Sequence, residues 1–403
     1  VLPLGSLCRK TATVGDLDIA VKTNNPEAVI NWFILYPRKL KIIEKGPTGA
    51  SLLLTNGRQV DLRVQKPEAF GAMLQYFTGS KNHNIHLREI ALKHGLSLSE
   101  YGIKSTIDSG QARMTEFRNE EELYKALKMD WIPPELREDM GEIEASLNHS
   151  LPKLIELIDI KGDLHVHSSY PIEPSHDTGA DSMEVILKKA ETLQYEYLGF
   201  SEHSPSISKH SKEQIYEIMF RRKKMIEQLK LTSKTVRVIN LLEVDILANG
   251  NLSVDNKSLE LIDGVIASIH RGCDQSKDTK TKRIIQALVN DKVRILGHPT
   301  GRKLGKREPC EADWERIFNF CREKNKAVEI NACPERFDLP DTLIRKAVKM
   351  GVKMVINTDS HEVESLDLMR FGVFMAQRGW CQKSDILNTL GYNEFYKWLK
   401  ERG

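Results

Sequence analysis

Short apolar runs alternate with stretches of helical periodicity from about residue 160 to the end of this 403-residue chain. Alternation of this kind is typical of parallel strands joined by helices in an α/β barrel or sheet. The apolar runs expected to be strands are 197–200, 236–242, 264–269, 293–296 and 354–356. A last helix is expected over 393–400, and no internal repeat is present.

The first part of the chain has a different pattern. Strands are expected at 18–21, 39–43, 51–55 and 60–64, with a helix over 25–35. Residues 67–103 change to helical spacing, whereas 105–150 are charged and interrupted by prolines, as in a linker with short helices. These changes predict a strand-rich unit (1–66), a small helical unit (67–110), a linker (111–158) and an α/β unit (159–403).

Composition adds limits to this picture. Hydrophobic residues make up 40% of the chain, and no apolar run approaches the length of a membrane span. Six cysteines without regular spacing favour a reducing cytoplasm over a disulfide framework. Residues 1–110 carry 14 Lys and Arg against 9 Asp and Glu, which fits contact with a phosphate backbone. Because the chain begins at Val1, we expect it to be a fragment that lacks its natural N-terminus.

Histidines and carboxylates follow most of the expected strands of the second part. Because such strand ends meet on one face of an α/β barrel, these side chains are expected to converge. They are His165, His167, His203, Glu243, His270, His298, Asp359 and His361, with His176 and Asp177 in a loop nearby. Mixed histidine and carboxylate ligands suit Zn²⁺ or Mn²⁺ better than Mg²⁺.

A second set of carboxylates lies in the first part. Asp16 and Asp18 are two residues apart on an expected strand, and Asp61 lies on another. Ionised carboxylates are costly to bury without partners, and their oxygen atoms suit two Mg²⁺ ions that assist phosphoryl transfer. Upstream, the turn at Gly5 and Ser6 and the cation of Arg9 are suited to a triphosphate.

These residues resemble the palm of the X-family DNA polymerases, within the nucleotidyltransferase superfamily. The string Tyr76-Phe77-Thr78-Gly79-Ser80, followed by Asn84 and Arg88, is similar to the thumb of that family. The resemblance implies that Asp16, Asp18 and Asp61 are catalytic and hold both metals. It also implies that the nucleotide is bound by Gly5, Ser6, Arg9, Tyr76, Phe77, Gly79 and Asn84, and the DNA template side by Arg88.

The histidine-rich part resembles the polymerase-and-histidinol-phosphatase (PHP) domain, a distorted (β/α)₇ barrel with up to three metal ions. The resemblance implies a first ion on His165, His167, Glu243 and Asp359. A second is implied on Glu243, His270 and His298, and a third on His203, His361 and either His176 or Asp177. Arg271, Arg302 and Lys303 follow ligand positions, where each could hold a substrate phosphate or be a surface charge.

Both parts in one chain resemble the bacterial and archaeal PolX family. The implied function is DNA repair: template-directed gap filling with dNTPs on primer-template or gapped DNA, and 3′–5′ exonuclease activity in the PHP domain. A monomeric, cytoplasmic and nucleoid-associated enzyme without a membrane is expected. One alternative is a small-molecule phosphatase of the histidinol-phosphatase type with a vestigial palm, and another is a non-catalytic DNA-binding scaffold.

Overall fold

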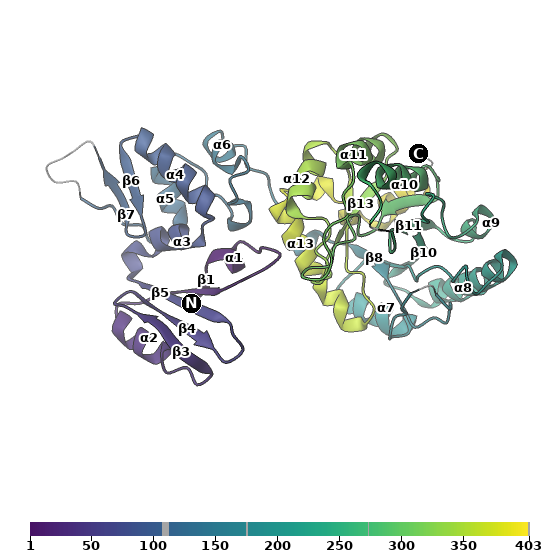
Figure 1. Ribbon diagram of the computed structural model, residues 1–403, viewed down its shortest axis with the longest axis horizontal. Helices are drawn as coiled ribbons and strands as arrows, with labels where there is room; N and C mark the ends of the chain where they lie inside the picture. Colours follow the sequence, from purple (N-terminus) through teal and green to yellow (C-terminus); the bar gives the residue numbers. More distant parts are fainter. Residues whose placement is uncertain (107–112, 175, 273, 402–403) are drawn as a thin grey trace. The chain divides into compact units, whose positions relative to one another are not determined.

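The computed structural model describes residues 1–106, 113–174, 176–272 and 274–401 (Figure 1). The chain divides into two compact units, Val1–Pro152 and Lys153–Gly403. The predicted boundary between residues 110 and 111 lies outside the described residues. Among the described residues, no helix is both long and apolar enough to cross a membrane.

The first unit begins with a mixed sheet of five strands in the order β1-β2-β5-β4-β3. These are β1 (Leu2–Pro3), β2 (Leu17–Lys22), β3 (Lys39–Lys45), β4 (Gly49–Leu54) and β5 (Gln59–Gln65). Only β2 and β5 pair in parallel. The short helix α1 (Gly5–Cys8) connects β1 to β2, and α2 (Pro26–Phe33) packs through Ile30 on Leu62 and Val64. The strands and the helix expected here are therefore confirmed.

The helical part of this unit consists of α3 (Phe70–Thr78) and α4 (Lys81–Lys93). Phe70 and Met73 pack against Leu4 and Ala20 of the sheet region. The prediction of helical structure up to residue 103 is wrong, because β6 (Leu96–Ser99) and β7 (Gly102–Ser105) form a hairpin. Gly95, with φ at 71°, takes the left-handed conformation that ends a helix, and alternating residues then form a strand.

The segment expected to be a linker contains packed elements. They are α5 (Glu120–Ala126), the 3₁₀ turn η2 (Pro134–Leu136) and α6 (Glu142–Leu147). Helix α5 packs on α3, and α6 packs on α4. Side chains of Tyr124, Ile132 and Arg137 are completely buried. Residues 113–152 therefore complete the first unit.

The second unit is a barrel of seven parallel strands in the order β14-β13-β12-β11-β10-β9-β8. The strands are β8 (Gly162–Val166), β9 (Tyr197–Phe200), β10 (Arg237–Asp245), β11 (Gly264–Ser268), β12 (Val293–Leu296), β13 (Ala327–Asn331) and β14 (Met354–Asn357). A bridge between Val166 and Ser360 brings the two edges together. The predicted (β/α)₇ barrel is confirmed.

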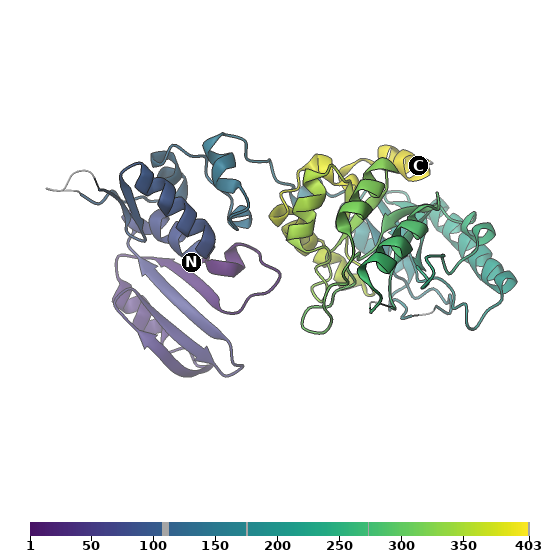
Figure 2. The same ribbon diagram turned by 45° about the horizontal axis from the view of Figure 1, so that its top comes forward.

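Helices lie around these strands in both views (Figure 1, Figure 2). They are α7 (Met183–Thr192), α8 (Lys212–Thr232), α9 (Asn256–Leu259), α10 (Lys277–Leu288), α11 (Trp314–Glu323), α12 (Asp341–Lys349), α13 (Met369–Arg378) and α14 (Tyr392–Lys400). Helix α14 contributes Phe395, Trp398 and Leu399 to the barrel core, which includes Leu241 and Ile266. Cys8, Cys321, Cys333 and Cys381 are free thiols.

Candidate active sites

Three carboxylates gather at the parallel pair β2 and β5 of the first unit. Asp18 and Asp61 are direct partners in the register of these strands, and Asp16 lies just before β2. Asp61 accepts a hydrogen bond from Gln59 Nε2 at 3.0 Å and another from Ser51 Oγ. Burial raises the pKa of Asp18, and the charges of Asp61 and Asp16 raise it further. A divalent cation relieves such repulsion, so this donor set fits Mg²⁺.

The turn at Gly5 lies directly against these carboxylates. Gly5 has φ at +56°, and a Cβ atom there would lie 2.2 Å from Asp18 Oδ2. Only glycine fits this close approach. The chain continues into α1, which contains Ser6 and ends before Arg9. The structure thus places Gly5 against Asp18, with Ser6 in the helix that begins there and Arg9 at the end of that helix.

Arg9 and the next residue, Lys10, form ion pairs with glutamates that lie far away in the sequence. Arg9 Nε lies 3.0 Å from Glu138 Oε1, and its Nη1 donates to the carbonyl oxygen of Thr78 at 2.5 Å. Lys10 Nζ lies 2.5 Å from Glu135 Oε1. These two glutamates were not predicted, because nothing in the local sequence shows that residues so far apart meet.

Two aromatic rings at the end of α3 each contact an arginine side chain from another element. The rings of Tyr76 and Phe77 pack edge to face with centroids 5.1 Å apart. Arg63 lies over the ring of Phe77 at 5.0 Å, and Arg88 lies over that of Tyr76 at 5.9 Å. Such cation–π contacts stabilise the rings in place. Arg88 therefore orients Tyr76 in this structure, alongside its predicted role at the DNA.

The predicted base contact, Asn84, already has intramolecular partners. Its side-chain amide donates to the carbonyl oxygen of Tyr76 at 2.7 Å, and its oxygen accepts from Gln75 Nε2 at 2.8 Å. Gly79, also predicted, approaches Arg9 closely, since a Cβ atom there would lie 3.1 Å from Arg9 Nη1. These bonds use one of the two N–H groups of the Asn84 amide, so the other can still donate to a nucleotide.

Arg137 holds the last part of the first unit together. Its guanidinium donates to both oxygens of Glu120, at 2.6 and 3.0 Å, and to the carbonyl oxygen of Ile132 at 2.8 Å. In return, the carbonyl oxygen of Arg137 accepts from Ser80 N at 3.0 Å. A fully buried guanidinium with a bidentate carboxylate partner is costly to disrupt from one side.

Replacing Arg137 with alanine is therefore expected to destabilise the first unit by about 3–5 kcal/mol, since Glu120 loses its partner. Hydrogen–deuterium exchange of α4 and α5 in the full chain measures this loss directly. Arg118→Ala, at an exposed position, is the matched control. Equal protection of both variants would contradict the assigned role of Arg137.

The strand ends of the second unit carry the predicted histidines and carboxylates to one place. Four groups of residues have ligand atoms all within 4.8 Å of one another. They are His167, His203 and His361; His165, His167 and Asp359; His176, Asp245 and His270; and His203, Glu243 and His270. The convergence follows from the barrel, in which parallel strands end on the same face.

Glu243 lies among four histidines of this centre. Its Oε2 lies 2.8 Å from His203 Nδ1 and 3.2 Å from His165 Nε2. Its Oε1 lies 2.8 Å from His298 Nε2 and 3.3 Å from His270 Nε2. Burial alone would raise the pKa of Glu243, but the surrounding histidines hold that pKa well below its usual range. A carboxylate that faces this many imidazoles is suited to bridge metal ions.

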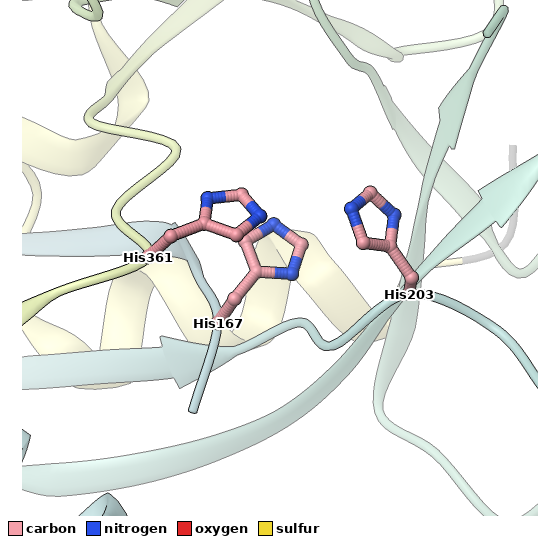
Figure 3. Close-up of side chains that lie close together, drawn as sticks. All are labelled: His167, His203 and His361. Carbon is pink, nitrogen blue, oxygen red and sulfur yellow. The ribbon is translucent and has the colours of Figure 1, made fainter. Parts of the chain in front are cut away.

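Figure 3 shows the rings of His203 and His361, two members of the third predicted group, close to the ring of His167, which was assigned to the first group. Asp177 Oδ1 lies 3.4 Å from His203 Nε2 and 3.8 Å from His361 Nε2. His176 instead bonds Asp245 Oδ1 at 3.0 Å. The geometry therefore favours Asp177 over His176 as the remaining member of the third group.

The polar atoms that face the centre fit bound metal ions. Among the described residues, several buried ligand atoms make no hydrogen bond of acceptable geometry: His165 Nε2, His167 Nδ1 and Nε2, Glu243 Oε2, His270 Nε2, His298 Nδ1 and His361 Nε2. Buried polar atoms almost always have partners, so this concentration of orphans is unusual. Imidazole nitrogens with a bridging carboxylate are a donor set for Zn²⁺ or Mn²⁺.

Carboxylates on the far side of the histidine rings from the centre hold these rings in position. None of these carboxylates was predicted as a site residue. His165 Nδ1 bonds Glu329 Oε1 at 2.7 Å, and His270 Nδ1 bonds Asp245 Oδ1 at 2.5 Å. Asp163 accepts from Thr358 Oγ1, and burial raises its pKa to about 7. A carboxylate on one ring nitrogen leaves the other free for a metal. Glu329 lies on β13. Its position within this apolar strand was the feature of the sequence that could have indicated its role beside His165.

Arg302 has a different role from those expected, and a second cation near the centre, Arg336, was not predicted. Arg302 donates from Nε to the carbonyl oxygen of Arg336 at 2.8 Å and from Nη2 to that of Phe337. Arg302 thus stabilises the loop after β13 through hydrogen bonds to backbone carbonyl oxygens. Arg336, which was not predicted, places Nε 3.3 Å from Asp359 Oδ2, while its Nη1 is buried without a partner.

Glu202, next to His203, lies behind the centre. Its carboxylate accepts from Arg222 Nε at 2.7 Å and from Ser168 Oγ at 2.5 Å. These bonds fix the loop that follows His167. Glu202 thus faces a buried arginine, Arg222.

Comparisons with known proteins agree with this division. Residues 73–138 match the family model described as DNA polymerase beta thumb, and residues 163–333 match the model of the PHP domain. The DNA polymerase/3′-5′ exonuclease PolX of Bacillus subtilis (strain 168) is 36% identical over 398 residues, which cover 98% of this chain and 68% of that protein. A probable phosphatase of Thermoanaerobacter sp. (strain X514) is 30% identical over 182 residues, 41% of this chain and 69% of its own.

A solved structure of Leishmania infantum polymerase beta in a ternary complex matches with a TM-score of 0.30 and 22% identity, covering 34% of this chain and 66% of that one. This likeness is too low to carry an argument.

The fold and the two carboxylate centres define a two-part enzyme, a nucleotidyltransferase joined to a PHP domain. The identity and coverage with the Bacillus relative then show that the chain belongs to the PolX family of DNA polymerases with a PHP domain.

Proposed function

We propose that this chain extends DNA 3′ ends with its first unit and shortens them with its second. The observation that carries the proposal is the presence of two separate centres, one of clustered aspartates and one of clustered histidines with Glu243. The substrates are primer-template or gapped DNA and dNTPs. The enzyme acts as a monomer in the cytoplasm, associated with the nucleoid.

In the first unit, Asp16, Asp18 and Asp61 hold two Mg²⁺ ions. These ions supply charge neutralisation for the attacking and leaving oxygens when bound. Ser6 and Arg9 bind the triphosphate, while Tyr76 and Phe77 contact the sugar from α3. The palm comprises residues 1–66, and the thumb begins at residue 67.

In the second unit, up to three Zn²⁺ or Mn²⁺ ions are held by His165, His167, Asp177, His203, Glu243, His270, His298, Asp359 and His361. Such ions lower the pKa of a coordinated water and polarise a phosphoryl group. Glu329 and Asp245 keep the rings of His165 and His270 oriented for binding. Arg336, with its buried Nη1, holds a phosphoryl oxygen of the DNA end.

Metal content tests the ligand assignment without any activity measurement. We expect the purified chain to hold two to three Zn²⁺ or Mn²⁺ ions that a strong chelator removes. Removal is expected to lower the melting temperature of the second unit, because the buried ligand atoms lose their partners. Elemental analysis and calorimetry measure both effects, and an unchanged melting temperature in metal-free protein would contradict the assignment.

Arg336→Ala is expected to lower kcat/KM for DNA 3′-end hydrolysis by about 10²-fold, with metal content unchanged. Arg336→Lys, which retains the charge, should recover part of this loss. Arg316→Ala, at an exposed position on α11, is the matched control. Loss of metal in Arg336→Ala would show instead that Arg336 acts only by supporting Asp359.

The phosphatase hypothesis remains the second candidate, because relatives named probable phosphatases match 41% and 49% of this chain. Comparing the hydrolysis of DNA 3′ ends with that of small phosphomonoesters such as histidinol phosphate decides between the two. The proposed function predicts much higher kcat/KM for DNA ends. A strong preference for the phosphomonoester would favour the phosphatase.

A further inference from the structure

Two glutamates of the first unit form ion pairs with Arg9, which is expected to bind the triphosphate, and with its neighbour Lys10. Glu138 Oε1 is 3.0 Å from Arg9 Nε, and Glu135 Oε1 is 2.5 Å from Lys10 Nζ. All four side chains are partly buried, with between 12% and 27% of their surface exposed. Ion pairs that are shielded in this way are stronger than those at an open surface.

The backbone that carries these glutamates is fixed. Arg137, between them, is completely buried and bonds both oxygens of Glu120. Its carbonyl oxygen accepts from Ser80 N at 3.0 Å, next to Gly79 of the thumb. The carboxylates of Glu135 and Glu138 are therefore presented by an anchored turn and do not belong to mobile surface side chains.

Arg9 also lies in the segment that contacts the catalytic carboxylates. Its backbone N–H donates to the carbonyl oxygen of Gly5 at 3.1 Å. Gly5, at the start of the same helix, contacts Asp18 directly. A triphosphate held next to Asp18 therefore lies near Arg9, whose guanidinium already faces a carboxylate.

We propose that Glu135 and Glu138 form a carboxylate clasp that competes with the incoming nucleoside triphosphate for Arg9 and Lys10. The inference rests on the proposed function, since it takes Arg9 to bind the triphosphate. The clasp neutralises the two cations in the nucleotide-free chain, so only a ligand of high negative charge, brought with its Mg²⁺ ions, displaces it. The glutamates thereby weaken the binding of nucleotides. A ligand with too few phosphate charges does not displace them.

The test is equilibrium binding of dTTP with Mg²⁺ to the full chain without DNA. In Glu135→Gln/Glu138→Gln, which keeps the shape and removes the charge, the Kd for dTTP should fall about three- to tenfold. Glu138→Asp, which shortens one arm of the clasp, should give a smaller fall in the same direction. Glu121→Gln, at an exposed position on α5, is the control and should leave the Kd unchanged.

An Arg9→Ala variant separates the two ways in which the idea can fail. If Arg9→Ala weakens dTTP binding while the glutamine variant binds dTTP no more tightly, the clasp is overturned and the role of Arg9 stands. If Arg9→Ala leaves the Kd unchanged, the proposed triphosphate contact is itself wrong, and the clasp fails with it. Weaker binding in the glutamine variant would show that the glutamates position Arg9 for the nucleotide.

Discussion

A chain with Glu243→Gln is expected to hydrolyse DNA 3′ ends at least about 10³-fold more slowly than the unsubstituted chain. The reason lies in the position of Glu243, whose two oxygens face His165, His203, His270 and His298 within 3.3 Å. Glutamine keeps the shape but removes the negative charge with which Glu243 would hold metal ions. Primer extension by the same variant is expected to be unchanged, because the aspartates belong to the other unit.

Gel analysis of a 5′-labelled primer, with and without dNTPs, measures both activities of this variant. Glu227→Gln, at an exposed position on α8, is the matched control and should behave like the unsubstituted chain. Nuclease activity that survives Glu243→Gln would mean that hydrolysis takes place away from this centre.

The second large effect is expected from Asp18→Asn. This variant should extend primers at least about 10³-fold more slowly, because Asp18 is the central member of the carboxylate cluster and faces Asp61 across paired strands. Shortening of DNA 3′ ends should continue at its normal rate. Glu27→Gln, at an exposed position on α2, provides the control in the same unit.

The outcome that contradicts this account is a joint loss of synthesis and hydrolysis in Asp18→Asn. Such a result would mean that the two centres do not act separately. Retention of synthesis would remove Asp18 from the catalytic residues and leave the cluster without a function in nucleotidyl transfer.

The barrel could be predicted from the sequence because its signal is local and repeated. Each strand is a short apolar run, and parallel strands necessarily bring their ends to one face. His203, His270 and His298 are recognisable for this reason alone. In the first unit, the Asp18 and Asp61 strands could be recognised individually, but their direct pairing became evident only from the register.

The parts that the sequence did not indicate depend on contacts between distant residues. Arg336 has no special sequence context, and its approach to Asp359 follows from the path of the loop after β13. Glu138 meets Arg9 although 129 positions separate them. The hairpin after α4 was missed because helical spacing continued into alternating residues, and Gly95 alone marked the change.

The central claim is that one chain holds separate centres for extending and shortening DNA 3′ ends. The most direct test is a denaturing gel of a 5′-labelled primer on a gapped template, incubated with Mn²⁺ in the presence and absence of dNTPs. We expect a shortened primer without dNTPs and an extended primer with them. A primer of unchanged length in both lanes, from a chain that hydrolyses small phosphomonoesters, would contradict it.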